Sequence, residues 1–117
     1  MIINWEKARN ITGDDPELYK DLWMMILESL DEKMQSIHTS LASGDWKESE
    51  FSVHKLKGAL RNVAAEDACA LLQQMEDAAR SGDMGKTNSY LPKVIEMVND
   101  VVSFFETANI KKEFSSN

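Results

Sequence analysis

Apolar residues recur at every third or fourth position through most of this chain, which is the spacing of helices that each bury one face. Proline occurs only at Pro16 and Pro92, and the glycines fall mostly between the periodic stretches. Short turns between long amphipathic helices make successive helices antiparallel. The sequence therefore predicts an all-α fold, an up-and-down antiparallel four-helix bundle with a short additional N-terminal helix.

Capping residues give approximate bounds for these helices. Asp15 and Pro16 suit the start of a long helix that ends at Gly44, and Asp45 followed by Glu48 resembles a capping box. We expect a short helix that begins near residue 4 and ends before the Thr-Gly-Asp-Asp stretch. The long helices are expected over about 16–43, 45–63, 66–80 and 91–105.

The length of 117 residues fits one domain, and 43% hydrophobic with 28% charged residues is ordinary for a folded protein. The last eight residues, Ile-Lys-Lys-Glu-Phe-Ser-Ser-Asn, offer little to bury. We therefore expect one helical domain over 1–109 and a flexible C-terminal tail over 110–117.

Charge and cysteine content exclude several classes of partner. Twenty acidic and 13 basic residues give a net charge of −7, which disfavours binding to the phosphates of nucleic acid. Cys69 is the only cysteine, so no internal disulfide can form, and with two separated histidines it makes no recognisable metal site. The sequence shows no signal peptide and no membrane-spanning run, so we expect a cytoplasmic chain without direct membrane contact.

One stretch, Ser-Val-His-Lys-Leu-Lys-Gly-Ala-Leu-Arg-Asn at 52–62, places its polar residues in a regular pattern. His54, Lys57, Gly58 and Arg61 share one helical strip, which we expect to face solvent. Glycine inside a helix costs roughly 1 kcal/mol relative to alanine. Gly58 is therefore expected to serve access to the imidazole one turn before it, rather than helix stability.

Phosphoryl transfer is the chemistry that suits this strip. An imidazole is largely unprotonated near neutral pH and is a good nucleophile, and its phosphoramidate can pass the group onward. The transition state spreads negative charge over the phosphoryl oxygens, so it needs positioning and a nearby cation. Lys57, one turn from His54, is the candidate cation.

The stretch from Val53 to Glu76, together with the turn and capping residues around its helices, resembles the histidine-containing phosphotransfer (HPt) domain family. Its His-x-Leu-Lys-Gly core lies on the third predicted helix, and the next helix ends in a Leu-x-x-Met-Glu pattern. The resemblance extends over about residues 3–105. It implies the four-helix bundle, a phosphorylated histidine and receiver domains as partners.

The resemblance also implies a role for each matching residue. His54 would be the phosphoacceptor through Nε2, Lys57 the cation that stabilises the phosphate, and Gly58 the residue that gives access. Glu76 would accept a hydrogen bond from Nδ1 of His54 and so hold the reactive tautomer. Arg80 matches a position where some members place a basic residue.

Two further basic residues, Lys55 and Arg61, are expected to contact the acidic surface of a receiver, as is Arg80. The chain departs from the family pattern at Ala64, where glycine is usual, and at Val53, where alanine is common. We expect Ala64 to keep the site small and Val53 to be a packing variant.

These features predict a phosphorelay intermediate that accepts a phosphoryl group from a receiver aspartate onto His54 and passes it to another receiver aspartate. The sequence contains no nucleotide-binding loop, so the chain is expected to be a phosphocarrier rather than an enzyme. It needs no cofactor of its own, because the receiver would hold any Mg²⁺. We expect a monomer, which could be free-standing or the cytoplasmic C-terminal domain of a membrane-bound hybrid sensor kinase.

One alternative remains at this point, an interaction module of the same fold that binds receivers without carrying phosphate. A metal-dependent bundle enzyme would need Glu-x-x-His pairs that face inward. Neither His38 nor His54 follows a glutamate by three residues, so the enzyme is set aside.

Overall fold

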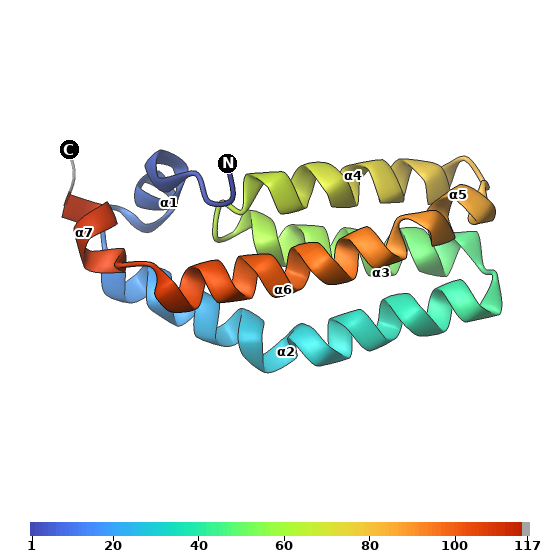
Figure 1. Cartoon of the computed structure of the whole chain (residues 1–117), viewed down its shortest axis with the longest axis horizontal. Helices are drawn as coiled ribbons and strands as arrows, with labels where there is room; N and C mark the ends of the chain where they lie inside the picture. Colours follow the sequence, from blue (N-terminus) through green and yellow to red (C-terminus); the bar gives the residue numbers. More distant parts are fainter. Residues whose placement is uncertain (116–117) are drawn as a thin grey trace.

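The computed structural model describes residues 1–115, which are helical over most of their length (Figure 1). No strand occurs among these residues. The helices are α1 (Trp5–Thr12), α2 (Pro16–Ser43), α3 (Trp46–Arg61), α4 (Glu66–Arg80), α5 (Met84–Ser89), α6 (Leu91–Thr107) and α7 (Ile110–Ser115).

Helices α2, α3, α4 and α6 run along the long axis of the molecule and form an antiparallel four-helix bundle (Figure 1). The molecule is elongated, with extents of 45 × 22 × 21 Å. The most extensive contact between two helices is that of α3 with α4. The predicted all-α bundle with a short N-terminal helix is confirmed.

The predicted caps are present at the N-termini of the long helices α2 and α3. The Asp15 side chain accepts hydrogen bonds from the backbone N–H groups of residues 17 and 18, and Pro16 occupies the first turn of α2. Asp45 caps α3 in the same way. These caps fix where α2 and α3 begin, and Gly44, with φ of 71°, makes the turn between them.

The turn from α3 to α4 is tight and contains a strained residue. Ala64 has φ of 59°, a left-handed conformation that glycine adopts at much lower cost than alanine. The N-terminal segment supports this turn, since the backbone N–H of Asn4 donates to the carbonyl oxygen of Ala64 at 2.9 Å. The usual glycine at this position therefore has a conformational reason, which the expectation that Ala64 keeps the site small did not include.

The core lies between the four long helices and extends to the end where α1 and α7 pack. Trp23 is fully buried and stacks on Phe105 with ring centroids 4.6 Å apart, which joins α2 to α6. Tyr19 is also buried, and its hydroxyl donates to the carbonyl oxygen of Val63 at 2.8 Å. This bond ties the start of α2 to the α3–α4 turn.

The structure corrects the expectation of a flexible tail over 110–117. Residues 110–115 form α7, in which Ile110 and Phe114 are buried. The Phe114 ring lies 5.3 Å from that of Tyr19 and 6.4 Å from that of Trp5, measured between centroids. These two apolar residues lie four positions apart on one face of the helix, so even a short helix has an apolar face to bury. Residues 116 and 117 of the expected tail lie outside the described part of the chain.

A second short helix, α5, was not predicted. It lies in the connection from α4 to α6, at the opposite end of the bundle from α1 and α7 (Figure 1). Asp83 caps it by accepting a hydrogen bond from the backbone N–H of Lys86. Within residues 1–115, no helix is both long enough and apolar enough to cross a membrane.

Candidate functional site

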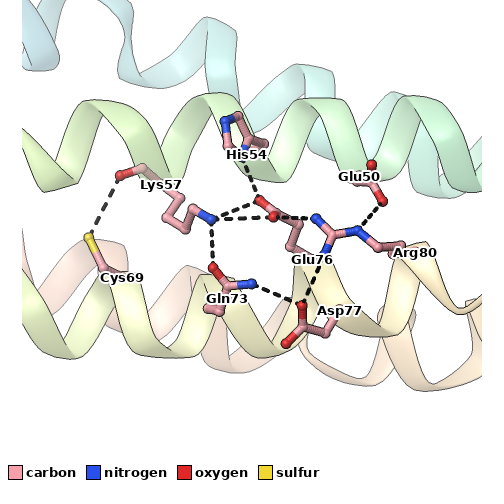
Figure 2. Close-up of polar contacts among 8 residues, drawn as sticks. All are labelled: Glu50, His54, Lys57, Cys69, Gln73, Glu76, Asp77 and Arg80. Carbon is pink, nitrogen blue, oxygen red and sulfur yellow. Dashed lines mark hydrogen bonds and ion pairs between the residues drawn. The ribbon is translucent and has the colours of Figure 1, made fainter.

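His54 lies on α3 and points toward α4, with 59% of its side chain exposed (Figure 2). Its Nδ1 atom is 2.8 Å from Oε1 of Glu76 on α4. An ionised carboxylate can only accept a hydrogen bond, so this contact places the ring hydrogen of a neutral imidazole on Nδ1. The lone pair is then on Nε2.

Glu76 is the buried centre of the site, with only 2% of its side chain exposed. Burial acts to raise the pKa of this carboxyl group, but hydrogen bonds from His54 and Lys57 outweigh burial and hold the pKa below its ordinary value of 4.5. Arg80 adds a third contact, from Nη2 to Oε2 at 3.0 Å. Glu76 is therefore an anion that His54 and two cations share.

Lys57 was expected to face solvent with the rest of the helical strip that contains His54, but the structure places it in the interior. Only 6% of its side chain is exposed, because it turns into the α3–α4 interface. Its Nζ atom donates to Oε1 of Gln73 at 2.6 Å and lies 3.1 Å from Oε1 of Glu76 (Figure 2). A periodic pattern locates the backbone position on the helix, but a long side chain can reach sideways to a buried anion.

Arg80 lies one turn beyond Glu76 on α4 and bridges back to α3. Its Nε atom is 3.0 Å from Oε2 of Glu50, and its Nη1 atom is 3.6 Å from Oδ1 of Asp77. Contacts with acidic groups on both helices raise the pKa of the Arg80 guanidinium, the hydrogen bond to Glu50 most of all. The side chain is 57% exposed, so it lies at the surface of the site.

Gly58 lies one helical turn after His54 on α3 and has open space beside it. A Cβ atom built on it would meet no heavy atom within 4 Å. Packing inside the domain therefore does not require glycine here.

The structure does not bring Lys55 and Arg61 into the network around Glu76. Lys55 is exposed and its Nζ atom lies 5.2 Å from the centroid of the Phe51 ring, on the side of α3 that faces α2. Arg61 is exposed at the end of α3. Both remain surface cations near the site.

Several residues at the site had not been singled out from the sequence. Gln73 and Asp77 flank Glu76 on α4, and Glu50 lies one turn before His54 on α3. A groove of about 520 Å³ borders the imidazole, and Phe51 and Trp46, 57% and 40% exposed, form part of its wall. The groove is lined by Trp46, Lys47, Glu50, Phe51, His54, Glu76 and Arg80.

Cys69 lies at the α3–α4 interface, close to the backbone of Lys57. The Cys69 thiol is half-buried, burial raises its pKa, and its Sγ atom lies 3.7 Å from the carbonyl oxygen of Lys57. The described residues contain no cluster of three or more His, Cys, Asp or Glu side chains that could hold a metal ion.

Comparison with known families agrees with this geometry. The family model described as the Hpt domain matches residues 21–104, which is well over half of the chain and includes α3 and α4 entirely. This chain belongs to the Hpt domain family. The searches of curated proteins and of solved structures returned no significant match.

Membership in the Hpt domain family places the chain among the histidine phosphotransfer domains of two-component systems. Members of this family are phosphocarrier modules without an ATP site of their own, and they interact with receiver domains. The exposed histidine of α3, with its buried carboxylate partner on α4, lies within the matched region.

Proposed function

We propose that this chain is a phosphorelay intermediate that accepts a phosphoryl group from a receiver-domain aspartate onto Nε2 of His54 and passes it to an aspartate of another receiver. The observation that carries the proposal is the 2.8 Å contact between Nδ1 of His54 and Glu76. It orients an exposed imidazole with its free lone pair away from the buried carboxylate.

In the accepting step, the Nε2 lone pair of His54 attacks the phosphorus of the aspartyl phosphate. The new N–P bond forms as the P–O bond breaks, and the aspartate leaves as a carboxylate. The imidazole ring gains positive charge while Nδ1 keeps its hydrogen, and the Glu76 carboxylate stabilises that charge. The donating step is the reverse of this reaction with a second receiver.

The cations of the site have different tasks in this proposal. Lys57 supplies positive charge close to His54, and in the unphosphorylated chain much of that charge balances Glu76, from which its Nζ atom is 3.1 Å away. Arg80 lies nearer the surface and is the cation that a bound receiver would meet. Gly58 leaves room for that receiver beside the imidazole.

The receiver would supply Mg²⁺ from its own acidic pocket, and this chain would act without a cofactor. Exposed Phe51 and Trp46 beside the imidazole would give the apolar part of the contact. Basic Lys55, Arg61 and Arg80 would orient the acidic partner on a chain that is otherwise strongly acidic. We further propose that the chain acts in the cytoplasm, as a monomer and without nucleic acid.

The experiment is transfer from a panel of phosphorylated receiver domains to the wild-type chain, to His54→Gln and to His38→Gln. We expect an acid-labile, base-stable label on the wild type and on His38→Gln, and no label on His54→Gln. A label that persists in His54→Gln would show that another residue carries the phosphate. Binding of receivers without any label would favour an interaction module that carries no phosphate.

A further inference from the structure

Gln73 contacts the site from α4, one turn before Glu76, through both ends of its amide. Its Oε1 atom accepts from Nζ of Lys57 at 2.6 Å, and its Nε2 atom donates to Oδ1 of Asp77 at 2.9 Å (Figure 2). An ammonium only donates and a carboxylate only accepts, so the two partners together fix the amide orientation. Gln73 therefore presents an oxygen, and not its NH₂ group, to Lys57.

The hydrogen bond to Gln73 matters because Lys57 and His54 share one oxygen atom of Glu76. Oε1 of Glu76 lies 2.8 Å from Nδ1 of His54 and 3.1 Å from Nζ of Lys57. The other contact of Lys57 with this carboxylate, to Oε2, is longer, at 3.3 Å. Each Glu76 contact of Lys57 is thus longer than its 2.6 Å bond to Gln73.

Lys57 has little access to water that could replace a lost acceptor. Its side chain is 6% exposed, and a buried ammonium without sufficient acceptors is strongly unfavourable. If the Gln73 oxygen were removed, the nearest remaining acceptor in the described structure would be the Glu76 carboxylate. Lys57 would then draw on the same oxygen that orients His54.

We propose that Gln73 is a positioning residue of this site. It takes the shortest hydrogen bond of the Lys57 ammonium, which limits how strongly Lys57 draws on the Oε1 atom of Glu76 that it shares with Nδ1 of His54. Asp77 sets the amide orientation that makes this possible. The proposal rests on the proposed function, because the tautomer matters for phosphoryl transfer only if His54 is the phosphoacceptor.

Two substitutions at Gln73 should act to different extents. Gln73→Met keeps the size but removes the acceptor, so we expect a lower share of the Nδ1–H tautomer of His54. Gln73→Glu keeps an acceptor for Lys57 but loses the donation to Asp77, so the share should fall less than in Gln73→Met. Gln74→Met and Gln74→Glu are matched controls, because Gln74 is exposed on the next position of α4.

The first measurement is the tautomer of His54, from the ¹⁵N shifts and long-range couplings of the imidazole ring by NMR. His38 is exposed on α2 and is the internal reference in the same spectrum. The second measurement is the rate at which phosphoramidate labels the chain. In that reaction an N–P bond to Nε2 of His54 forms as the P–N bond of the reagent breaks. The nitrogen of the reagent is already protonated, so it leaves as ammonia, and Nδ1 of His54 keeps its hydrogen.

We expect Gln73→Met to lower both the Nδ1–H share and the labelling rate, the rate by roughly threefold, as for the loss of one hydrogen bond of ordinary strength. The controls at Gln74 should match the wild type. Unchanged tautomer and rate in a Gln73→Met chain that is folded by circular dichroism would overturn the proposal. So would an equal loss in Gln73→Glu, because it would show that the amide itself, and not the acceptor, is needed.

The tautomer also separates this proposal from the proposed function. If receivers and phosphoramidate fail to label the wild-type chain while Gln73→Met still changes the His54 tautomer, the phosphorelay function fails and the positioning role of Gln73 stands. If labelling depends on His54 but Gln73→Met leaves the tautomer unchanged, the phosphorelay function stands and the role of Gln73 fails.

Discussion

Nδ1 of His54 and Oε1 of Glu76 lie 2.8 Å apart, although the two residues are 22 positions apart in sequence and come from different helices. The imidazole is exposed and the carboxylate is buried. This asymmetry leaves Nε2 open to a partner while Nδ1 stays in a fixed contact inside the domain. The α3–α4 interface therefore determines which nitrogen of His54 is held in a contact and which is left open.

Substitution of Glu76 should separate the hydrogen bond from the negative charge. Glu76→Gln keeps an oxygen that can accept from Nδ1, so we expect phosphoryl transfer at a reduced rate. Glu76→Leu removes the acceptor and should slow transfer by about tenfold or more. Rapid-quench transfer from a phosphorylated receiver measures both rates.

Gln74→Leu, on the same helix but exposed, is the control for this comparison and should transfer at the wild-type rate. Equal rates for Glu76→Leu and the wild type would contradict an orienting role for Glu76.

The lowered pKa of Glu76 predicts how stability depends on pH. Its pKa in the folded chain is below the ordinary value of 4.5, so the unfolded chain binds more protons in this range. The contribution of Glu76 to the free energy of unfolding should therefore be fully present above its ordinary pKa of 4.5, and it should be lost as pH falls from there through the lower pKa of the folded chain. Glu76→Gln lacks the titrating group and should show a shallower acid dependence.

Urea unfolding of the two proteins between pH 3 and pH 7 checks this prediction. Glu66, whose pKa is also lowered, chiefly by a hydrogen bond from Lys7, is present in both proteins and cancels in the difference. Parallel pH profiles would show that Glu76 contributes nothing to acid sensitivity.

Gly58 should make α3 less stable than alanine would, while it lets a receiver approach His54. No atom would clash with an added Cβ, so Gly58→Ala should stabilise the chain by about 1 kcal/mol. Gly58→Leu should slow transfer from a receiver much more than labelling by phosphoramidate, because only the receiver is a large partner. Parallel losses in the two reactions would indicate a disturbed imidazole rather than a blocked approach.

Much of the fold could be predicted because its signals are local. Asp15, Pro16 and Asp45 mark helix starts, and the apolar period marks the long helices. Helix α7 could not be predicted in this way, since six residues form a helix only where tertiary contacts hold them, here through the burial of Ile110 and Phe114.

The site was predictable to a smaller extent. The spacing of His54, Lys57 and Gly58 places them on one helix, but the burial of Lys57 depends on the side chains that α4 presents to it. Nothing in the sequence of α3 indicates that Gln73 accepts from this lysine. The register between two helices, which decides such contacts, is a property of packing and not of either helix alone.

The turn that joins these helices gives the last prediction. Ala64 has φ of 59°, where an L-residue other than glycine pays about 1 kcal/mol or more in backbone strain, while glycine also loses more entropy on folding. Because relief of strain is the larger effect, Ala64→Gly should raise the free energy of unfolding by roughly 0.5–1 kcal/mol. Ala65→Gly is the matched control: with φ of −80° this buried neighbour has no such strain, so its replacement should destabilise the chain. Urea unfolding at pH 7 distinguishes the two, and a destabilised Ala64→Gly would show that the Ala64 methyl group, which is buried, contributes more through packing than its backbone conformation costs.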